Sequence, residues 1–194
     1  KRKNAWYVKI DEKWVSDWFN QHGIDELFPH FKMAMRLITN RTGSKWLSLT
    51  QNEIATINTE AEHIYGLLHA RYICQPRGLE LMRRLYDKKL FGKCPRYACH
   101  GTQLIPMGTT FTPRKHSTKL FCPCCYDIYR APNDMITDGA HFGPAFPHIF
   151  LLEYPDLDRH NKFTPFTLTA FGFPIRRSPE DEELPHDRTA HLEE

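Results

Sequence analysis

The sequence predicts an α+β protein, with an all-helical amino-terminal domain followed by a small metal-held β module, a short helix and an extended carboxy-terminal segment. Apolar residues recur at helical spacing through the first 92 residues, whereas prolines, cysteines and short β-type stretches dominate after Gly92. The chain has 194 residues, of which 41% are hydrophobic and 25% charged. This length supports one or two folded domains, and this composition excludes a disordered or fibrous chain.

The first helix is expected to begin after Asp11, whose carboxylate can cap it. Its apolar face would carry Val15, Trp18 and Phe19, and Gly23 would end it. A second helix is expected at about 29–38, because apolar residues there fall on one face. These segments open a domain predicted to span residues 1–92.

A connector is expected from Thr39 to Gln51. The sequence Thr59-x-x-Glu62 has the capping-box pattern, which predicts that a third helix starts there. Pro76 suits the first turn of a fourth helix, whose inward positions would be Leu79, Met82 and Leu85. Cys74 is expected to be a small core residue of the third helix.

Residues 93–156 are predicted to form the β module, with strands near 118–121 and 126–130 and a short helix near 147–153. Residues 157–177 form a third region, in which 161–177 alternate aromatic residues, threonine and proline and should be extended or hairpin-like. The acidic residues 178–194 are expected to be a disordered tail.

Four of the six cysteines indicate a structural zinc site. Cys94 and Cys99 form a C-x4-C pair, Cys122 and Cys125 form a C-x2-C pair, and 22 residues separate the pairs. Four thiolates arranged as a tetrahedron suit Zn²⁺ and close its coordination shell, which disfavours zinc hydrolysis. An iron–sulfur cluster is the main alternative, and Cys124 is an alternative ligand to Cys125.

The charge distribution is uneven. The net charge is +3, but residues 178–194 carry seven acids and one arginine, and residues 93–130 carry six basic residues and one acid. This pattern suggests ordinary surface charge or an anionic partner. Apolar runs are too short to span a membrane, no secretion signal is recognised, and no motif of a nucleotide-binding fold, hydrolase or kinase occurs, so we expect no enzyme.

Three stretches together resemble the regulatory β subunit family of casein kinase 2, also written casein kinase II. They are Tyr65-Gly-Leu-Leu-His-Ala-Arg-Tyr-Ile73 with Arg77-Gly78; Phe91-Gly-Lys-Cys-Pro-Arg96 through the four cysteines; and Thr137-Asp-Gly-Ala-His-Phe-Gly143 with Phe146-Pro-His148. Their order and spacing match the family over roughly residues 6–175.

The resemblance implies a non-catalytic subunit that dimerises through a zinc ribbon and binds kinase catalytic α subunits, giving an α₂β₂ holoenzyme that acts on protein substrates in nucleus and cytoplasm. It implies that the zinc ligands are Cys94, Cys99, Cys122 and Cys125. It also implies that the kinase-docking element is a hairpin whose tip is Phe171-Gly172-Phe173. Two aromatic rings beside a glycine suit docking into an apolar groove.

The sequence also departs from the family. Phe171 replaces the usual tyrosine, Pro174 replaces a basic residue, Thr109 replaces an apolar residue used in dimer packing, and residues 39–51 lack the family's acids. The segment from Phe163 to the tip is also about two residues longer than the family pattern. Two alternatives are therefore retained: a zinc-ribbon protein that binds nucleic acid, and a divergent β-like subunit of a larger assembly.

Overall fold

The computed structural model describes residues 5–133 and 137–175, so the acidic tail expected at 178–194 lies outside the described residues. The chain divides into two compact units, Lys1–Phe163 and Thr164–Glu194. The predicted mixture of helix and sheet is confirmed. The helical part and the cysteine-rich part share the first unit, and the domain boundaries near residues 92, 156 and 177 remain predictions.

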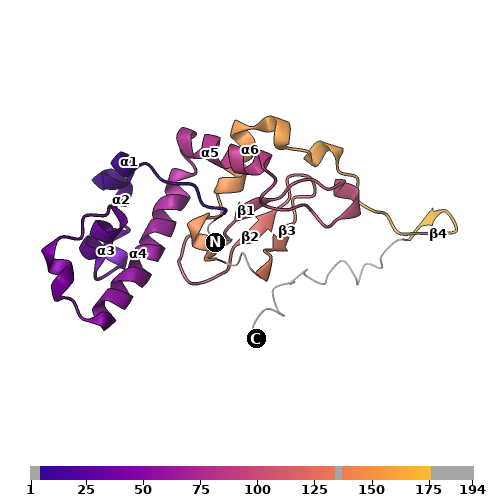
Figure 1. Ribbon diagram of the computed structural model, residues 1–194. Helices are drawn as coiled ribbons and strands as arrows, with labels where there is room; N and C mark the ends of the chain where they lie inside the picture. The colour runs from indigo at the N-terminus through magenta and orange to yellow at the C-terminus, as the bar shows by residue number, and fades with distance from the viewer. Residues whose placement is uncertain (1–4, 134–136, 176–194) are drawn as a thin grey trace. The chain divides into compact units, whose positions relative to one another are not determined.

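Every element that the structure describes up to Asp87 is helical. Figure 1 shows α3 beside the long helix α4, against which it packs. An extended segment precedes the helices and buries Trp6, Val8 and Ile10. The elements are α1 (Glu12–Ser16), α2 (Trp18–Gln21), η1 (Asp25–Leu27), α3 (Phe31–Ile38), η2 (Ser44–Ser48), α4 (Gln51–Tyr72) and α5 (Pro76–Asp87).

The first expected helix is in fact two short helices. Asp11 caps α1 as predicted, because its carboxylate accepts two backbone N–H groups of the first turn. Asp17 then adopts an extended conformation and caps α2 separately. The new helix rotates Trp18 and Phe19 away from the core, and they are 74% and 72% exposed. The prediction that they share the apolar face of Val15 is therefore wrong.

Helix α4 begins about two and a half turns earlier than predicted, with its N-cap at Thr50 instead of Thr59. Thr50 is its N-cap: its hydroxyl accepts the Glu53 backbone N–H (3.3 Å), and the Glu53 carboxylate accepts the Thr50 backbone N–H (2.8 Å). Thr59 lies inside the helix, where its hydroxyl donates to the Ala55 carbonyl oxygen (3.0 Å). The added turns bury Ile57, which is 1% exposed.

A three-stranded antiparallel sheet follows, in the order β1-β2-β3. Its strands are β1 (Ile105–Met107), β2 (Lys119–Phe121) and β3 (Ile128–Arg130), so the two predicted strands are confirmed and β1 was missed. Phe121 pairs with Ile105 on one side and with Ile128 on the other. Pro106 interrupts the strand signal of β1, and proline is tolerated there because β1 is an edge strand.

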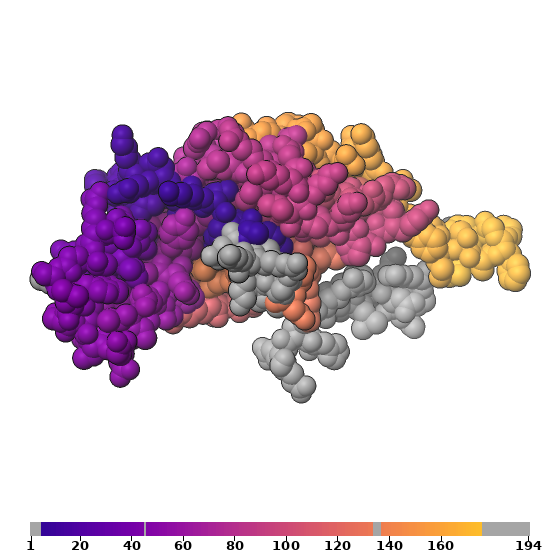
Figure 2. All heavy atoms as spheres, in the orientation of Figure 1, coloured from indigo at the N-terminus to yellow at the C-terminus, as the bar shows by residue number. Residues whose placement is uncertain are grey.

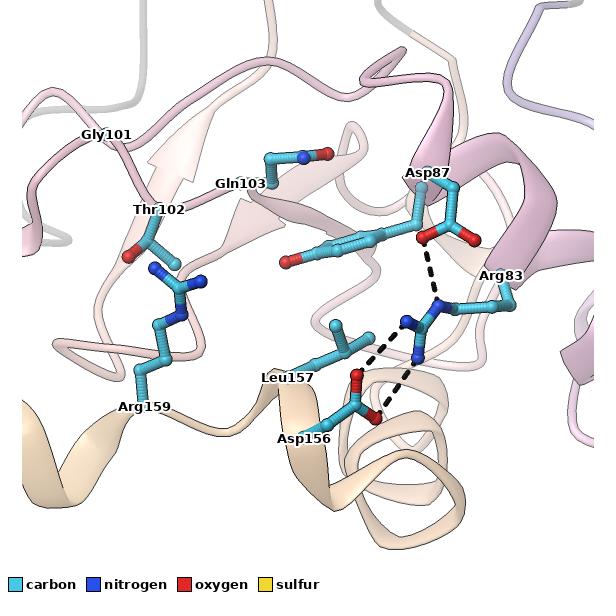
Figure 3. Close-up of a pocket in the computed structure, with 9 residues that line it drawn as sticks. Arg83, Asp87, Gly101, Thr102, Gln103, Asp156, Leu157 and Arg159 are labelled. Carbon is cyan, nitrogen blue, oxygen red and sulfur yellow. Dashed lines mark hydrogen bonds and ion pairs between the residues drawn. The ribbon is translucent and has the colours of Figure 1, made fainter.

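Helix α6 (Phe146–Glu153) packs on β1 and agrees with the predicted short helix. Pro76 occupies the first turn of α5, as predicted. Arg83 of α5 forms a bidentate ion pair with Asp156 of η6 (Pro155–Leu157), at 3.2 and 3.1 Å, and also contacts Asp87 at 3.0 Å (Figure 3). A cavity of about 330 Å³ lies beside this ion pair, and Arg159 also lines it.

One continuous hydrophobic core runs from Trp6 to Leu157. On the face drawn in Figure 2, the amino-terminal helices and the middle of the chain lie directly against one another. His69 is fully buried in it. Its Nδ1–H donates to the His141 carbonyl oxygen (2.8 Å), so its Nε2 accepts the Val8 backbone N–H (3.2 Å). Among the described residues, no helix is both long and apolar enough to cross a membrane.

Candidate metal centre and exposed hairpin

The four cysteines of the two short-range pairs lie together, and their sulfur atoms are all within 4.8 Å of one another. The Cys94 and Cys125 sulfurs are 3.9 Å apart, as are those of Cys99 and Cys122. A tetrahedral ion with Zn–S bonds of about 2.3 Å requires sulfur separations of about 3.8 Å. The donor set and its spacing therefore fit a zinc-sized ion.

Hydrogen bonds fix the two loops that carry the cysteines. The Cys94 backbone N–H donates to the Thr102 carbonyl oxygen (2.8 Å), and the Cys122 N–H donates to that of Asp127 (3.0 Å). An ion pair between Arg96 and Asp127 then links one loop to the other. Each loop closes on itself, and the second is also held by the segment after η6, where the Arg159 backbone N–H donates to the Pro123 carbonyl oxygen (2.9 Å).

The thiols of this cluster differ in pKa. Burial, followed by neighbouring thiols, raises the pKa of Cys99, and burial raises that of Cys122 to about 12. Burial also acts to raise the pKa of Cys125, but hydrogen bonds from Tyr129 and from the backbone outweigh it and lower that pKa. Four adjacent thiolates without a cation would repel one another, so this cluster is suited to a divalent cation that neutralises them.

Three other side chains able to bind a metal, the alternative ligand Cys124 among them, lie outside this cluster. Cys124 is buried outside the four-sulfur cluster, and its backbone N–H donates to the Cys122 sulfur (3.4 Å). His100 is exposed, with a left-handed backbone (φ 48°). Cys74 lies in the turn after α4 rather than in the helix, and burial raises its pKa to about 11.

Sequence reasoning missed Tyr129, which lies behind the sulfurs on β3. Its hydroxyl is 3.4 Å from the Cys94 sulfur and 3.3 Å from the Cys125 sulfur. The hydroxyl can donate to a thiolate and stabilise its negative charge. The only sign of this contact in the sequence is that Tyr129 follows Cys125 by four residues.

Residues Thr164–Glu194 form the second unit, whose described part is an antiparallel hairpin of β4 (Thr169–Ala170) and β5 (Phe173–Pro174). Phe171 and Gly172 form its two-residue turn, and both have positive φ, 53° and 84°. Such turns match the twist of paired strands, but positive φ strains a phenylalanine. The strands thus hold Phe171 at the tip.

The hairpin is rich in exposed apolar side chains. Phe171 is completely exposed and Phe173 is 75% exposed, so neither is part of the core. Phe166, Leu168 and Ile175 are also exposed. Isolated two-stranded hairpins are marginally stable in water, so this one is suited to folding fully against another surface.

A second cluster was also missed: His63, Asp138 and His141 offer nitrogen and oxygen atoms within 4.8 Å of one another. These residues come from α4 and from the segment before α6, and their sequence separation leaves no spacing motif.

Comparisons with known proteins agree on one family. The family described as casein kinase II regulatory subunit matches residues 1–174. Casein kinase II subunit beta' of Drosophila melanogaster is 35% identical over 177 residues, which cover 90% of this chain and 80% of that protein. Putative casein kinase II subunit beta-4 of Arabidopsis thaliana is 34% identical over 176 residues, covering 90% of this chain and 62% of that protein. The chain thus spans less than two thirds of some relatives that it matches.

Proposed function

Because this chain belongs to the casein kinase II regulatory subunit family, we propose that it is a non-catalytic subunit that dimerises and binds kinase catalytic subunits. The regulatory role follows from the family, whose members are regulatory rather than catalytic subunits. Family membership favours this function over binding of nucleic acid. The observation that carries the docking proposal is the exposed aromatic tip of the hairpin.

The proposed metal is a structural zinc ion held by Cys94, Cys99, Cys122 and Cys125. The 3.9 Å sulfur separations support this assignment. When bound, zinc neutralises the thiolates and cross-links the two loops, and four protein ligands leave no position for a reacting water. The two loops adjoin the strands of the three-stranded sheet, so we expect the fold of this sheet to depend on the ion.

Zinc content tests this assignment. We expect metal analysis of the purified chain to find zinc, and the Cys99→Ser variant to lose it together with ribbon structure. Cys124→Ser is the matched control, because this neighbouring cysteine lies outside the cluster. Equal zinc retention in both variants would contradict the assigned ligand set.

The proposed kinase-docking site is Phe171-Gly172-Phe173. Both rings are already exposed, so they can bury their apolar surfaces in a groove of the kinase without first leaving a core. Truncating a central aromatic anchor typically weakens binding by about 2–4 kcal/mol, or about 30- to 1,000-fold. The replacement of tyrosine by Phe171 removes a hydroxyl but keeps the apolar surface.

Sedimentation with a casein kinase II catalytic subunit tests docking. We expect the wild-type chain to form a dimer that recruits kinase, and Phe171→Ala/Phe173→Ala to dimerise without recruiting it. Phe111→Ala is the matched control, because Phe111 is 64% exposed in the other unit. A wild-type chain that never binds kinase would overturn the docking proposal and favour membership of a larger assembly.

Dimerisation is proposed to use the zinc ribbon. Thr109, after β1, is exposed, and its polar side chain should weaken packing at an apolar dimer contact. We therefore expect Thr109→Val to tighten the dimer in sedimentation equilibrium.

A nuclear and cytoplasmic location is proposed with this function, and tagged protein in cells would test it.

A further inference from the structure

A second group of potential metal ligands lies where α4 meets η5 (Gly139–His141). His63 lies on α4, Asp138 caps η5, and His141 ends it. Their side chains are 18% exposed for His63 and 9% exposed for Asp138, and residue His141 is 9% exposed overall. The group is therefore recessed but reachable from the surface on the His63 side.

The position of His141 depends on a glycine of α4. A Cβ atom at Gly66 would lie 2.0 Å from Cδ2 of the His141 ring, so only glycine lets the ring lie against the helix here. Gly66 is three residues after His63, on the same face of α4. The ring is thereby brought to 5.9 Å from the ring of His63, centroid to centroid.

Hydrogen bonds fix His141 and leave one nitrogen for a ligand. Its Nδ1 is 2.7 Å from the Tyr7 hydroxyl, and its backbone carbonyl accepts the Nδ1–H of His69. Its Nε2 is buried without a hydrogen-bond partner among the described residues. A metal-binding histidine is typically held in this way, with one nitrogen bonded to a neighbour and the other free.

His63 and Asp138 offer their ligand atoms close to that of His141, all within 4.8 Å of one another. The His63 Nδ1 is also buried without a hydrogen-bond partner among the described residues, and it lies 3.7 Å from the Asp138 Oδ2, too far for a hydrogen bond. Asp138 is oriented by the Ala140 backbone N–H, which donates to its other oxygen (3.0 Å). Two unpartnered imidazole nitrogens beside a carboxylate are costly unless something binds between them.

We propose that His63, Asp138 and His141 form a second metal site, which binds Zn²⁺ or a similar divalent transition-metal ion. Two imidazole nitrogens and one carboxylate oxygen form a set that binds Zn²⁺, and three protein ligands leave a position for water. Burial lowers the pKa of His141 to about 4, and burial followed by Arg114 lowers the pKa of His63. Both rings are therefore neutral at pH 7, the state that binds metal.

Arg114 competes with the metal at this site. Its Nε–H donates to the His63 Nε2 (2.9 Å), and its backbone N–H donates to the Asp138 Oδ2 (2.6 Å). Coordination through the His63 Nδ1 places the ring proton on Nε2, which can then no longer accept from Arg114. Metal binding and this side-chain contact therefore exclude each other, and binding would release Arg114, which lies in the β1–β2 loop.

Metal titration of the full chain tests the proposal. Protein holding metal at its cysteines is titrated with Zn²⁺ against a chromophoric chelator. We expect the wild-type chain to bind one further ion, His63→Gln to bind it at least about 10-fold more weakly, and Arg114→Gln to bind it about 10-fold more tightly. His22→Gln, an exposed histidine, is the control and should match the wild type.

A Co²⁺ titration distinguishes this site from cysteine binding. The extra ion should add the weak visible bands of nitrogen and oxygen ligands without sulfur-to-cobalt charge transfer, and His63→Gln should remove them. His63 lies at the rim, so its variant should fold, which circular dichroism checks. Equal binding by wild type and His63→Gln, or charge transfer from the extra ion, would overturn the proposal.

Discussion

The contact between Gly66 and His141 allows a quantitative prediction. The Gly66→Ala substitution would favour helix α4 by about 1 kcal/mol in an open site. Here the new methyl would lie 2.0 Å from Cδ2 and 2.3 Å from Cγ and Nε2 of His141, whereas ordinary contact begins near 3.4 Å. The ring must move, which loses its Tyr7 hydrogen bond as well as its packing. We therefore expect Gly66→Ala to lower the free energy of unfolding by about 1–3 kcal/mol.

A double-mutant cycle isolates this contact. In a His141→Ala background the ring is absent, so Gly66→Ala should stabilise the chain by up to about 1 kcal/mol. The coupling between the two sites is thus expected to be about 3 kcal/mol. Urea unfolding followed by circular dichroism, at one fixed zinc concentration, measures all four chains. An equal effect of Gly66→Ala in both backgrounds would refute the reasoning.

Three further results are expected. Burial lowers the pKa of His69 and that of His141 from 6.5 to about 4, so the stability that each neutral ring contributes is complete above pH 6.5 and falls by about 1.4 kcal/mol per pH unit from there towards pH 4. A flat urea-unfolding profile would contradict this. Tyr129→Phe should speed zinc loss to a chelator about 10-fold, because it removes the hydroxyl beside two sulfurs, and an unchanged rate would remove its assigned role. With its pKa raised to about 11, Cys74 should react about 100-fold more slowly with iodoacetamide at pH 8 than a free cysteine does, and mass spectrometry of the labelled peptide tests this.

Local signals in the sequence predicted local structure well. The C-x4-C and C-x2-C pairs predicted a cluster because each pair lies within one loop, and the structure brings the four sulfurs together. Pro76 correctly predicted the start of α5. The capping box was less decisive, because Thr50-x-x-Glu53 and Thr59-x-x-Glu62 share the same pattern. The burial of Ile57 against the rest of the core favours the earlier start, and pattern alone does not encode that contact.

Long-range contacts set the limit of prediction. His63 and Asp138 become neighbours only when α4 packs against η5, and no pattern of residue spacing in the sequence predicts that contact. Trp18 and Phe19 fit a helical period, yet the cap at Asp17 restarts the helix and turns them outward. The hairpin could be predicted as extended, but the positive φ of Phe171 depends on strand pairing rather than on residue preference.

The buried imidazole of His69 also has a consequence for synthesis of the chain. Its two hydrogen bonds join Val8 to His141, positions that leave the ribosome at very different times. Until His141 emerges, the helices made first lack a partner for this polar group and for the apolar surface around it. The amino-terminal helices can therefore complete their packing only after the segment Gly139–His141 has been made, and we expect a fragment that ends before Gly139 to expose apolar surface and to aggregate or be degraded.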